Sequence, residues 1–292
     1  MKTILITGIN GYLGSQLAKR YSKHFNIVGL EYDTIDLSRI KDENFEVFPS
    51  KNGIPDELFT KYRIDVIIHT ATFYGRNNES NGHMTYANMY LPQLLLEKAI
   101  KNACPLFINT DTVMNRFTSS YALSKKQFKD WLEFYAKKDQ INVINFKLDH
   151  FYGPGTSNTN FITLMVQKML QNDHIINLTK AEQNRDFLFI DDLVSVYDLM
   201  LNSNIKYNFF EEFSVGSGVN TNLKEILEFI KNKTNSNSIL NYGAIQYRND
   251  ELMQSNNDIS PLIELGWKPN TTIKEGLLKV IKFETESLKK NK

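Results

Sequence analysis

A threonine, a tyrosine and a lysine in the middle of the chain have the types and spacing needed for proton transfer. Tyr121 and Lys125 are four residues apart, so on a helix both side chains would lie on one face. A lysine ammonium beside a phenol stabilises the phenolate and lowers the tyrosine pKa, which lets the tyrosine exchange a proton near neutral pH. Thr110, which ends an apolar run, would hydrogen-bond the same reacting oxygen. The alternative is an exposed Tyr and Lys on an ordinary helix, so the interpretation depends on a cofactor site.

The first residues of the chain carry the signature of such a site. An apolar run at 2–7 leads into Gly8, Gly11 and Gly14, and a helical pattern follows. Glycines between a strand and a helix let a pyrophosphate approach the backbone at the helix N-terminus. Taken alone, a glycine turn is weak support, but its place between strand and helix favours a dinucleotide. The same turn contributes three further candidate cofactor contacts, Asn10, Tyr12 and Leu13.

An acidic residue follows the second predicted strand, 26–30. Glu31 stands about twenty residues past the glycines, where a carboxylate accepts hydrogen bonds from the adenosine ribose and repels a 2′-phosphate. This favours NAD(H). Asp33 is the reserve for this role, and a solvated loop acid is the alternative. No basic residue stands beside Glu31, and the nearest downstream are Arg39 and Lys41, which a folded-back loop would bring in.

The elements that must position these residues alternate between strand and helix. Strands are predicted at 65–70, 106–110 and 143–148, and small residues, Ala71 and Thr72, follow the first of them. Small residues at a strand end let a cofactor lie across the sheet. Alternation of this kind predicts an α/β fold with a doubly wound, Rossmann-type parallel sheet. We expect a dinucleotide-binding domain at 1–155 and a smaller substrate-binding α/β lobe at 156–292, with a segment near 213–218 returning to the sheet.

Composition excludes several other classes of protein. The net charge is +1 with scattered basic residues, which argues against nucleic acid as a partner. No apolar run is long enough to cross a membrane, and the start of the chain resembles no signal peptide. A single cysteine suits the cytoplasm, and no Cys/His cluster has metal-ligand spacing. We therefore expect a cytoplasmic enzyme that binds no metal.

Several segments together resemble the extended short-chain dehydrogenase/reductase family, also called the NAD-dependent epimerase/dehydratase family, whose members act on nucleotide sugars. The resemblance rests on TGINGYLG, HTAT, Thr110 with Tyr121-x-x-x-Lys125, HFYGPG, the RDF segment from Arg185, FSVGSG and LGWKP. Within the family, FYGRNNE, YALSKKQF and RNDELMQS are similar to the CDP-abequose and CDP-paratose synthases, which reduce the C4 ketone of a CDP-linked sugar in O-antigen biosynthesis.

This resemblance implies a role for each matching residue. Tyr121 would donate the proton, Lys125 would lower its pKa and hold the nicotinamide ribose, and Thr110 would orient the substrate oxygen. His150 stands where the family usually has Asn. Arg185 and Arg248 would contact the nucleotide diphosphate, and Asn160 and Glu251 would lie near the nucleoside. The residues implied in substrate binding are Tyr74, Arg76, Asp111, His150, Asn160, Arg185, Arg248 and Glu251.

The resemblance also narrows the activity. Sugar-nucleotide dehydratases carry Thr-Asp-Glu where this chain has Thr110-Asp111-Thr112, so no base for elimination of water is evident. The expected activity is a nucleotide-sugar 4-ketoreductase. The nearest alternative is a 4-epimerase with tightly bound NAD, and one from another class is a non-catalytic dinucleotide-sensing subunit. Related reductases generally use NADPH, whereas Glu31 favours NADH. Many relatives dimerise, so we expect a homodimer. The helix with Tyr121 carries an apolar stripe that would serve either as its interface or as plain core, at Phe128, Trp131, Leu132 and Tyr135.

Overall fold

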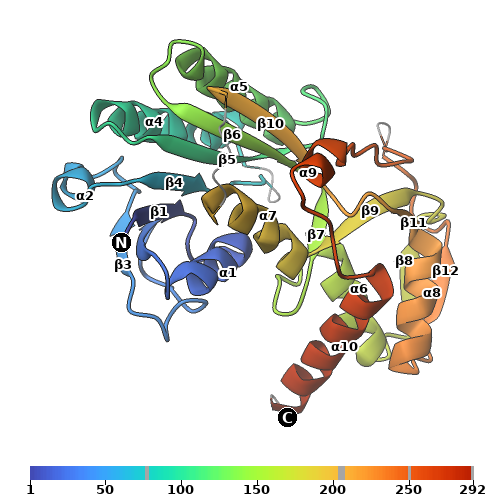
Figure 1. Cartoon of the computed structure of the whole chain (residues 1–292). Helices are drawn as coiled ribbons and strands as arrows, with labels where there is room; N and C mark the ends of the chain where they lie inside the picture. The colour runs from blue at the N-terminus through green and yellow to red at the C-terminus, as the bar shows by residue number, and fades with distance from the viewer. Residues whose placement is uncertain (76–78, 203–207, 249–250, 291–292) are drawn as a thin grey trace. The chain divides into compact units, whose positions relative to one another are not determined.

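The computed structural model describes residues 1–75, 79–202, 208–248 and 251–290, and the chain divides into two compact units (Figure 1). The first unit contains residues 1–148 and 204–213, and the second contains 149–203 and 214–292. Residues 149–155, which we expected in the first domain, fall in the second because they include a strand, His150–Tyr152, that pairs with Asn184–Phe189. The expected division into a cofactor domain and a substrate lobe stays a prediction about function.

A seven-stranded sheet forms the centre of the first unit, in the order β10-β6-β5-β4-β1-β2-β3. Every pair from β3 to β6 is parallel, and the strand order reverses between β1 and β4, which is where open α/β sheets bind ligands. This confirms the predicted Rossmann-type sheet. Its strands are β1 (Thr3–Thr7), β2 (Asn26–Glu31), β3 (Glu46–Pro49), β4 (Val66–His69), β5 (Leu106–Thr112), β6 (Asn142–Leu148) and β10 (Phe210–Val215).

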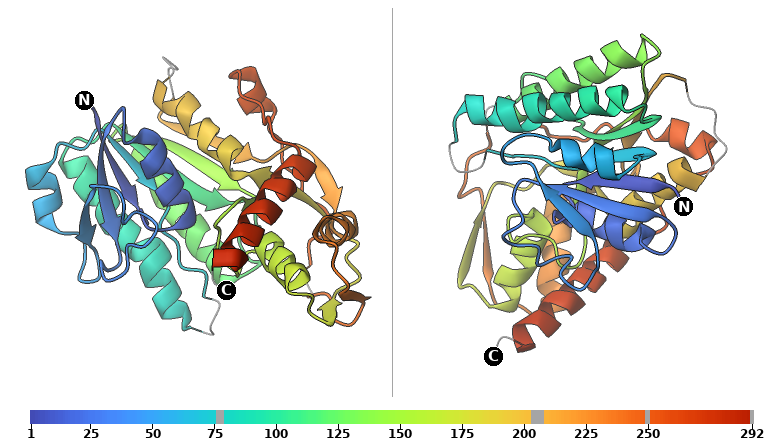
Figure 2. Two further views of the ribbon diagram at one scale, coloured as in Figure 1. Left: turned by 90° about the horizontal axis from the view of Figure 1, so that it is seen from below. Right: turned by 90° about the vertical axis from the view of Figure 1, so that its left-hand side faces the viewer.

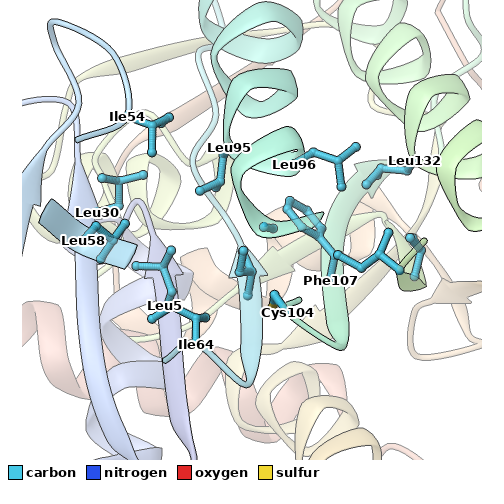
Figure 3. Packing of buried hydrophobic residues seen from close by; sticks show 14 of the residues in the cluster. Leu5, Leu30, Ile54, Leu58, Ile64, Leu95, Leu96, Cys104, Phe107 and Leu132 are labelled. Atoms are coloured by element: carbon cyan, nitrogen blue, oxygen red, sulfur yellow. The ribbon is translucent and has the colours of Figure 1, made fainter. Parts of the chain in front are cut away.

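The core of this unit lies between the sheet and three helices (Figure 3). Leu5 and Phe107 of the sheet contact a layer that includes Leu58, Leu96 and Leu132, and all five are fully buried. Each such side chain contributes about 1.5–3 kcal/mol when it leaves water. The helices of this unit are α1 (Tyr12–Tyr21), α2 (Asp56–Lys61), α3 (Asn81–Thr85), the π-helix η1 (Tyr86–Tyr90), α4 (Leu91–Lys101) and α5 (Ser120–Ala136).

Helix α5 carries the Tyr121 and Lys125 pair, and its apolar residues are divided between the core and the surface. Ser119 caps its start, because the Ser119 hydroxyl accepts a hydrogen bond from the Ala122 N–H at 3.1 Å. Phe128 and Leu132 are fully buried in the core and Tyr135 packs against it, so of the stripe that we expected in a homodimer only Trp131 is exposed.

The second unit is built from two small sheets and five helices among its described residues. One sheet has the order β11-β9-β7 and the other pairs β12 with β8, while α6, α8 and α10 pack against one another (Figure 2). The strands are β7 (His150–Tyr152), β8 (Ile175–Leu178), β9 (Asn184–Phe189), β11 (Asn220–Asn222) and β12 (Ile239–Tyr242). The helices are α6 (Phe161–Leu170), α7 (Ile190–Asn202), α8 (Leu223–Thr234), α9 (Ser260–Glu264) and α10 (Ile273–Lys290).

Two absences hold for the described residues. None of their helices has the length and apolar character to cross a membrane. None of their histidine, cysteine and acidic side chains gather in threes or more to form a metal site.

Candidate active site

Lys125 is a buried lysine of the first unit. Only 1% of the residue is exposed, and Nζ has no hydrogen-bond partner within the described part of the chain. Burial lowers the pKa of Lys125 to about 8, while the negative charge of Asp111 opposes this change. The side chain therefore still carries its positive charge at neutral pH. Tyr121 lies one helical turn before it on α5, as the spacing predicted.

Tyr74 contacts the ring of Tyr121 directly. The two ring centroids are 5.1 Å apart and the ring planes differ by 32°, and Tyr74 is half exposed. The backbone just before Tyr74 is fixed by Asn88, whose Oδ1 accepts from the Phe73 N–H at 2.8 Å and whose Nδ2 donates to the Phe73 carbonyl at 2.7 Å. Nδ2 also donates to Ser124 Oγ on α5 at 3.1 Å. Asn88 thus joins the Tyr74 loop to the helix that carries Tyr121.

Asn88 was not among the site residues that the sequence predicted. It lies inside η1, and π-helical turns often occur at functional sites. Its two partners are distant in the sequence, so no local pattern identifies the contact. Arg76, which we expected to contact substrate from the same loop, lies outside the described residues.

The Thr110 side chain hydrogen-bonds to the neighbouring strand, β4. Its hydroxyl donates to the His69 carbonyl of β4 at 2.7 Å, so the proton that a ketone oxygen would have to receive is already used. Binding a ketone at Thr110 therefore requires the hydroxyl to exchange partners. His69 itself is buried, and burial holds its pKa well below the usual value, so the imidazole is neutral.

Asp111 points into the protein. Its carboxylate pairs with Lys126 Nζ at 2.8 Å and accepts from the Thr112 N–H at 2.7 Å and Asn145 Nδ2 at 3.3 Å. The side chain is completely buried. These internal donors differ from the substrate contact that we expected, and they make Asp111 a fixed negative charge behind the active site.

The glycine turn has no room for a side chain at any of its three glycines, and a Cβ on Gly11 would lie 2.9 Å from the Gly8 carbonyl oxygen. Gly8 has φ +65°, and a Cβ there would lie 2.8 Å from the Ala71 Cα, while a Cβ on Gly14 would overlap the Gly8 carbonyl oxygen. The turn is therefore a compact backbone cradle at the start of α1, whose N-cap is Gly11. Ala71, which follows β4, lies against this cradle.

Glu31 turns its carboxylate toward the same cradle. Oε2 accepts from the Asn10 N–H at 3.0 Å and Oε1 accepts from the Tyr32 N–H at 3.1 Å. Burial raises the pKa of Glu31, although these two hydrogen bonds act in the opposite direction. A carboxylate in this position retains lone pairs for a ribose hydroxyl.

Two buried polar atoms of this unit have no hydrogen-bond partner among the described residues, namely Lys125 Nζ and Thr72 Oγ1. Unsatisfied buried groups are uncommon and often belong to binding sites. Together with the glycine cradle and Glu31, they fit a nicotinamide dinucleotide, whose ribose hydroxyls and amide supply hydrogen-bond partners.

In the second unit, Arg185 and Glu251 lie together. Arg185 Nη2 donates to Glu251 Oε1 at 2.5 Å, and Gln183 Nε2 donates to the same oxygen at 3.2 Å. Arg185 is buried, whereas Arg248 is exposed on the connector before Glu251. The two arginines predicted to contact the diphosphate therefore have different environments. Arg185 already has an anionic partner in Glu251, whereas Arg248 is exposed.

His150 and Asn160 also lie in the second unit. His150 Nδ1 is 2.6 Å from Asp149 Oδ1. Burial alone would raise the pKa of Asp149, but hydrogen bonds and charge from His150, with help from Asn257, lower it below the usual value. Asn160 caps α6, since its Oδ1 accepts from the Ile162 N–H at 3.1 Å and its Nδ2 donates to the Phe151 carbonyl at 3.1 Å. Its amide is thus engaged in structure.

The chain is similar over most of its length to one protein family and to several named proteins. Residues 4–216 match the model of the NAD dependent epimerase/dehydratase family. The CDP-abequose synthases of Salmonella muenchen and Salmonella typhimurium are 31% and 29% identical, covering 97% and 96% of this chain and 98% and 97% of their own. A dTDP-4-dehydro-6-deoxyglucose reductase of Escherichia coli is 24% identical and covers 96% of both chains. A UDP-glucose 4-epimerase structure from Thermotoga maritima has a TM-score of 0.85 at 20% identity and covers 98% of this chain and 99% of its own.

Proposed function

The chain belongs to the NAD dependent epimerase/dehydratase family, and on this premise we propose that it reduces the C4 ketone of a nucleotide-activated 4-keto-deoxy sugar. Its cofactor is accordingly a nicotinamide dinucleotide, as expected. A CDP-linked sugar of surface polysaccharide is the favoured substrate, because relatives alike over nearly the whole chain are CDP-abequose synthases. The observation that carries the proposal is the buried, unpartnered Lys125 ammonium one turn from Tyr121.

The residues of the first unit divide the work of reduction among them. When bound, the dinucleotide supplies the hydride. Tyr121 donates its phenolic proton to the oxygen that becomes the product hydroxyl, and the Lys125 charge stabilises the phenolate left behind. Tyr74, which contacts the Tyr121 ring, holds that ring in place. Thr110 exchanges the His69 carbonyl for the substrate oxygen.

The residue after Asp111 favours reduction over elimination. Elimination of water needs a base near the carbon acid, and Thr112 cannot serve because its hydroxyl has no useful basicity. The neighbouring Asp111 is held by Lys126 and Asn145. A 4-epimerase would use the same Tyr121 and Lys125, so the state of the cofactor after purification separates the two activities.

One experiment tests the proposal directly. The protein is incubated with NADH or NADPH and a panel of nucleotide 4-keto sugars, and the product is identified by NMR. We expect stoichiometric oxidation of the dinucleotide and a C4 hydroxyl in the product. A protein that purifies with tightly held NAD, and interconverts C4 epimers without consuming cofactor, would be an epimerase. Absence of any turnover on the panel would favour the non-catalytic alternative.

We also propose that the protein works as a cytoplasmic homodimer. Its single cysteine, Cys104, is buried and free, which suits a reducing compartment. Exposed aromatic side chains lie on two neighbouring helices, with Trp131 and Phe134 on α5 and Tyr86 and Tyr90 on η1. Trp131 is the one residue of the predicted α5 stripe in this aromatic surface, and a second copy of the chain would cover the surface.

A further inference from the structure

Lys126, the residue after the buried Lys125, forms an ion pair inside the first unit. Its Nζ lies 2.8 Å from Asp111 Oδ2 and donates to the Thr112 carbonyl at 2.6 Å. The Asp111 side chain is completely buried, whereas 15% of the Lys126 side chain is exposed. The ion pair therefore joins α5, the helix that carries Tyr121, to the end of β5, with Lys126 as the partner closer to solvent.

Asp111 is also held by the sheet. Its Oδ1 accepts from the Thr112 N–H at 2.7 Å, and its Oδ2 accepts from Asn145 Nδ2 of β6 at 3.3 Å. Asn145 is itself fixed, because its Nδ2 donates to Glu212 Oε2 of β10 at 2.9 Å and its Oδ1 accepts from Asn109 Nδ2 at 2.7 Å. The Asp111 carboxylate thus has a position set by donors on β5, β6 and α5.

This ion pair acts on Lys125 through charge alone. Lys125 Nζ has no hydrogen-bond partner in the described part of the chain, so neighbouring charges decide how readily it loses its proton. Burial lowers the pKa of Lys125, the Asp111 charge raises it, and the Lys126 charge lowers it further. Because Asp111 is paired with Lys126, its carboxylate offsets only part of the cost of burying the Lys125 ammonium.

We propose that Lys126 is a positioning residue of the active site, which holds the Asp111 carboxylate in an ion pair and thereby leaves the Lys125 ammonium without an anionic partner. An anion paired with Lys125 would stabilise the ammonium and weaken its attraction for the phenolate of Tyr121. Lys126 would thus act through Lys125 on the proton donor. The inference rests on the proposed roles of Tyr121 and Lys125 in reduction.

The other titratable groups on the elements that contact α5 are neutral, paired or at least partly exposed. His69 of β4 is buried, and burial holds its pKa so low that the ring is neutral. Lys147 of β6 pairs with Glu212 Oε1 at 3.0 Å, and Lys129 of α5 itself pairs with Glu133 at 2.9 Å. The remaining groups are His83 on α3, Tyr86 and Tyr90 on η1, Glu97, Lys98 and Lys101 on α4, and Asp130 and Tyr135 on α5. The ion pair is therefore the pair of charges that acts on the buried lysine.

The test titrates Lys125 by NMR in the whole protein, without cofactor or sugar. Isotope-labelled lysine gives the side-chain signals, and the signal that is missing in Lys125→Met belongs to Lys125. We expect a midpoint of about pH 8 in wild type. The midpoint should rise by about one pH unit or more in Lys126→Met, which frees Asp111, and fall by a similar amount in Asp111→Asn, which removes the anion.

Three further variants separate charge from structure. Lys126→Arg keeps the ion pair and should keep the midpoint, and so should the control Lys129→Met, which lacks a paired lysine one turn along the same helix. The double variant of Asp111→Asn and Lys126→Met should lie within about half a pH unit of wild type, because the charges of an ion pair nearly cancel. Lys126→Gln, which can still donate to Asp111, serves if Lys126→Met does not fold.

Turnover gives a second reading. The alkaline limb of the pH–rate profile should move to higher pH in Lys126→Met and to lower pH in Asp111→Asn, following the NMR midpoints. Midpoints that move by less than about half a pH unit in both single variants, or that move in the same direction, overturn the proposal. A protein that shows the expected midpoints but reduces no sugar contradicts the reduction and supports the effect of the ion pair on Lys125, so the two failures are distinguishable.

Discussion

Lys125 has an environment unlike that of a surface lysine, and its titration has a measurable consequence. Its pKa is about 8 in the folded protein, against 10.5 for an ordinary lysine. Each pKa unit corresponds to about 1.4 kcal/mol, so the buried charge costs about 3 kcal/mol below pH 8. Between pH 8 and 10.5 the unfolded chain binds more protons than the folded protein, so stability rises with pH in this window.

Lys125→Met should expose this cost. In the absence of cofactor, the difference in free energy of unfolding between the variant and wild type should favour the variant most at pH 7. By pH 10 this difference should have shifted by about 3 kcal/mol in favour of wild type. Urea denaturation at both pH values measures the difference, and the exposed Lys101→Met is the control. Turnover should be lost in parallel. An offset between variant and wild type that is the same at both pH values would show that Lys125 is not buried as a charge.

Tyr121→Phe tests the proton donor. The ring and its contact with Tyr74 remain, so folding and cofactor affinity should be retained, while turnover should fall by about 10² or more. Steady-state kinetics and fluorescence titration of the reduced cofactor measure the two quantities. Tyr90→Phe, on an exposed tyrosine of η1, is the matched control. A near-normal rate in Tyr121→Phe would assign the proton to another group.

At the scale of elements, the Asn88 bridge joins η1, the Tyr74 loop and α5. Asn88→Ala would leave the Phe73 N–H and carbonyl without partners, so we expect a loss of about 2 kcal/mol of stability. Turnover should fall further than stability explains, since the Tyr74 ring loses its support against Tyr121. Chemical denaturation and kinetics are compared with Asn81→Ala, an exposed asparagine of α3. Equal effects of the two substitutions would contradict the bridging role.

The pairing of β9 with the connector that carries Glu251 predicts different behaviour for the two arginines. Arg185→Ala should weaken nucleotide-sugar binding by about 2 kcal/mol and also lower the melting temperature, because the largely buried Glu251 loses its partner. Arg248→Ala should weaken binding alone, since Arg248 is exposed. Calorimetry with the nucleotide sugar and thermal unfolding separate the two effects. If both variants leave binding unchanged, neither arginine contacts the diphosphate.

The sequence was most informative where a local pattern decides the structure. The strands ending at Glu31 and Leu148 are apolar runs in the sequence, so they were predicted within a few residues. The strand expected near 213–218 is instead Phe210–Val215. β3, β8 and β12 were not predicted, because each has only four residues and, unlike the equally short β4, none is buried along its whole length.

The features that the sequence did not predict depend on contacts between residues far apart in the chain. The Arg185–Glu251 ion pair joins residues that are 66 positions apart, and the Asn88–Ser124 bond spans 36. The α5 stripe shows the same limit, because Leu132 and Trp131 are equally apolar in sequence, yet only Leu132 is in the core. Apolar periodicity in the sequence identifies an apolar side of a helix. It does not show which residues of that side pack in the core of the same chain and which stay exposed.

At the scale of the whole molecule, the exposed aromatic surface predicts the oligomeric state. Wild type should be a dimer by light scattering at micromolar concentration, and Trp131→Glu with Phe134→Glu should be monomeric, because two carboxylates would be buried at the interface. The control is Phe283→Glu, an equally exposed aromatic on α10 of the other unit. A monomeric wild type, or a dimer that persists in the double variant, would contradict the assignment.

The position of β10 has a consequence for synthesis of the chain. β6 ends at Leu148, but its neighbour at the sheet edge, β10, begins at Phe210. On the ribosome, at roughly 5–20 residues per second, several seconds pass before β10 emerges. During that interval β6 is an open edge with unpaired backbone groups and apolar side chains, which invites pairing with another nascent chain. The sheet is therefore most vulnerable to aggregation while the second unit is being translated, and a ribosome that stalls between 148 and 210 would leave it in that state.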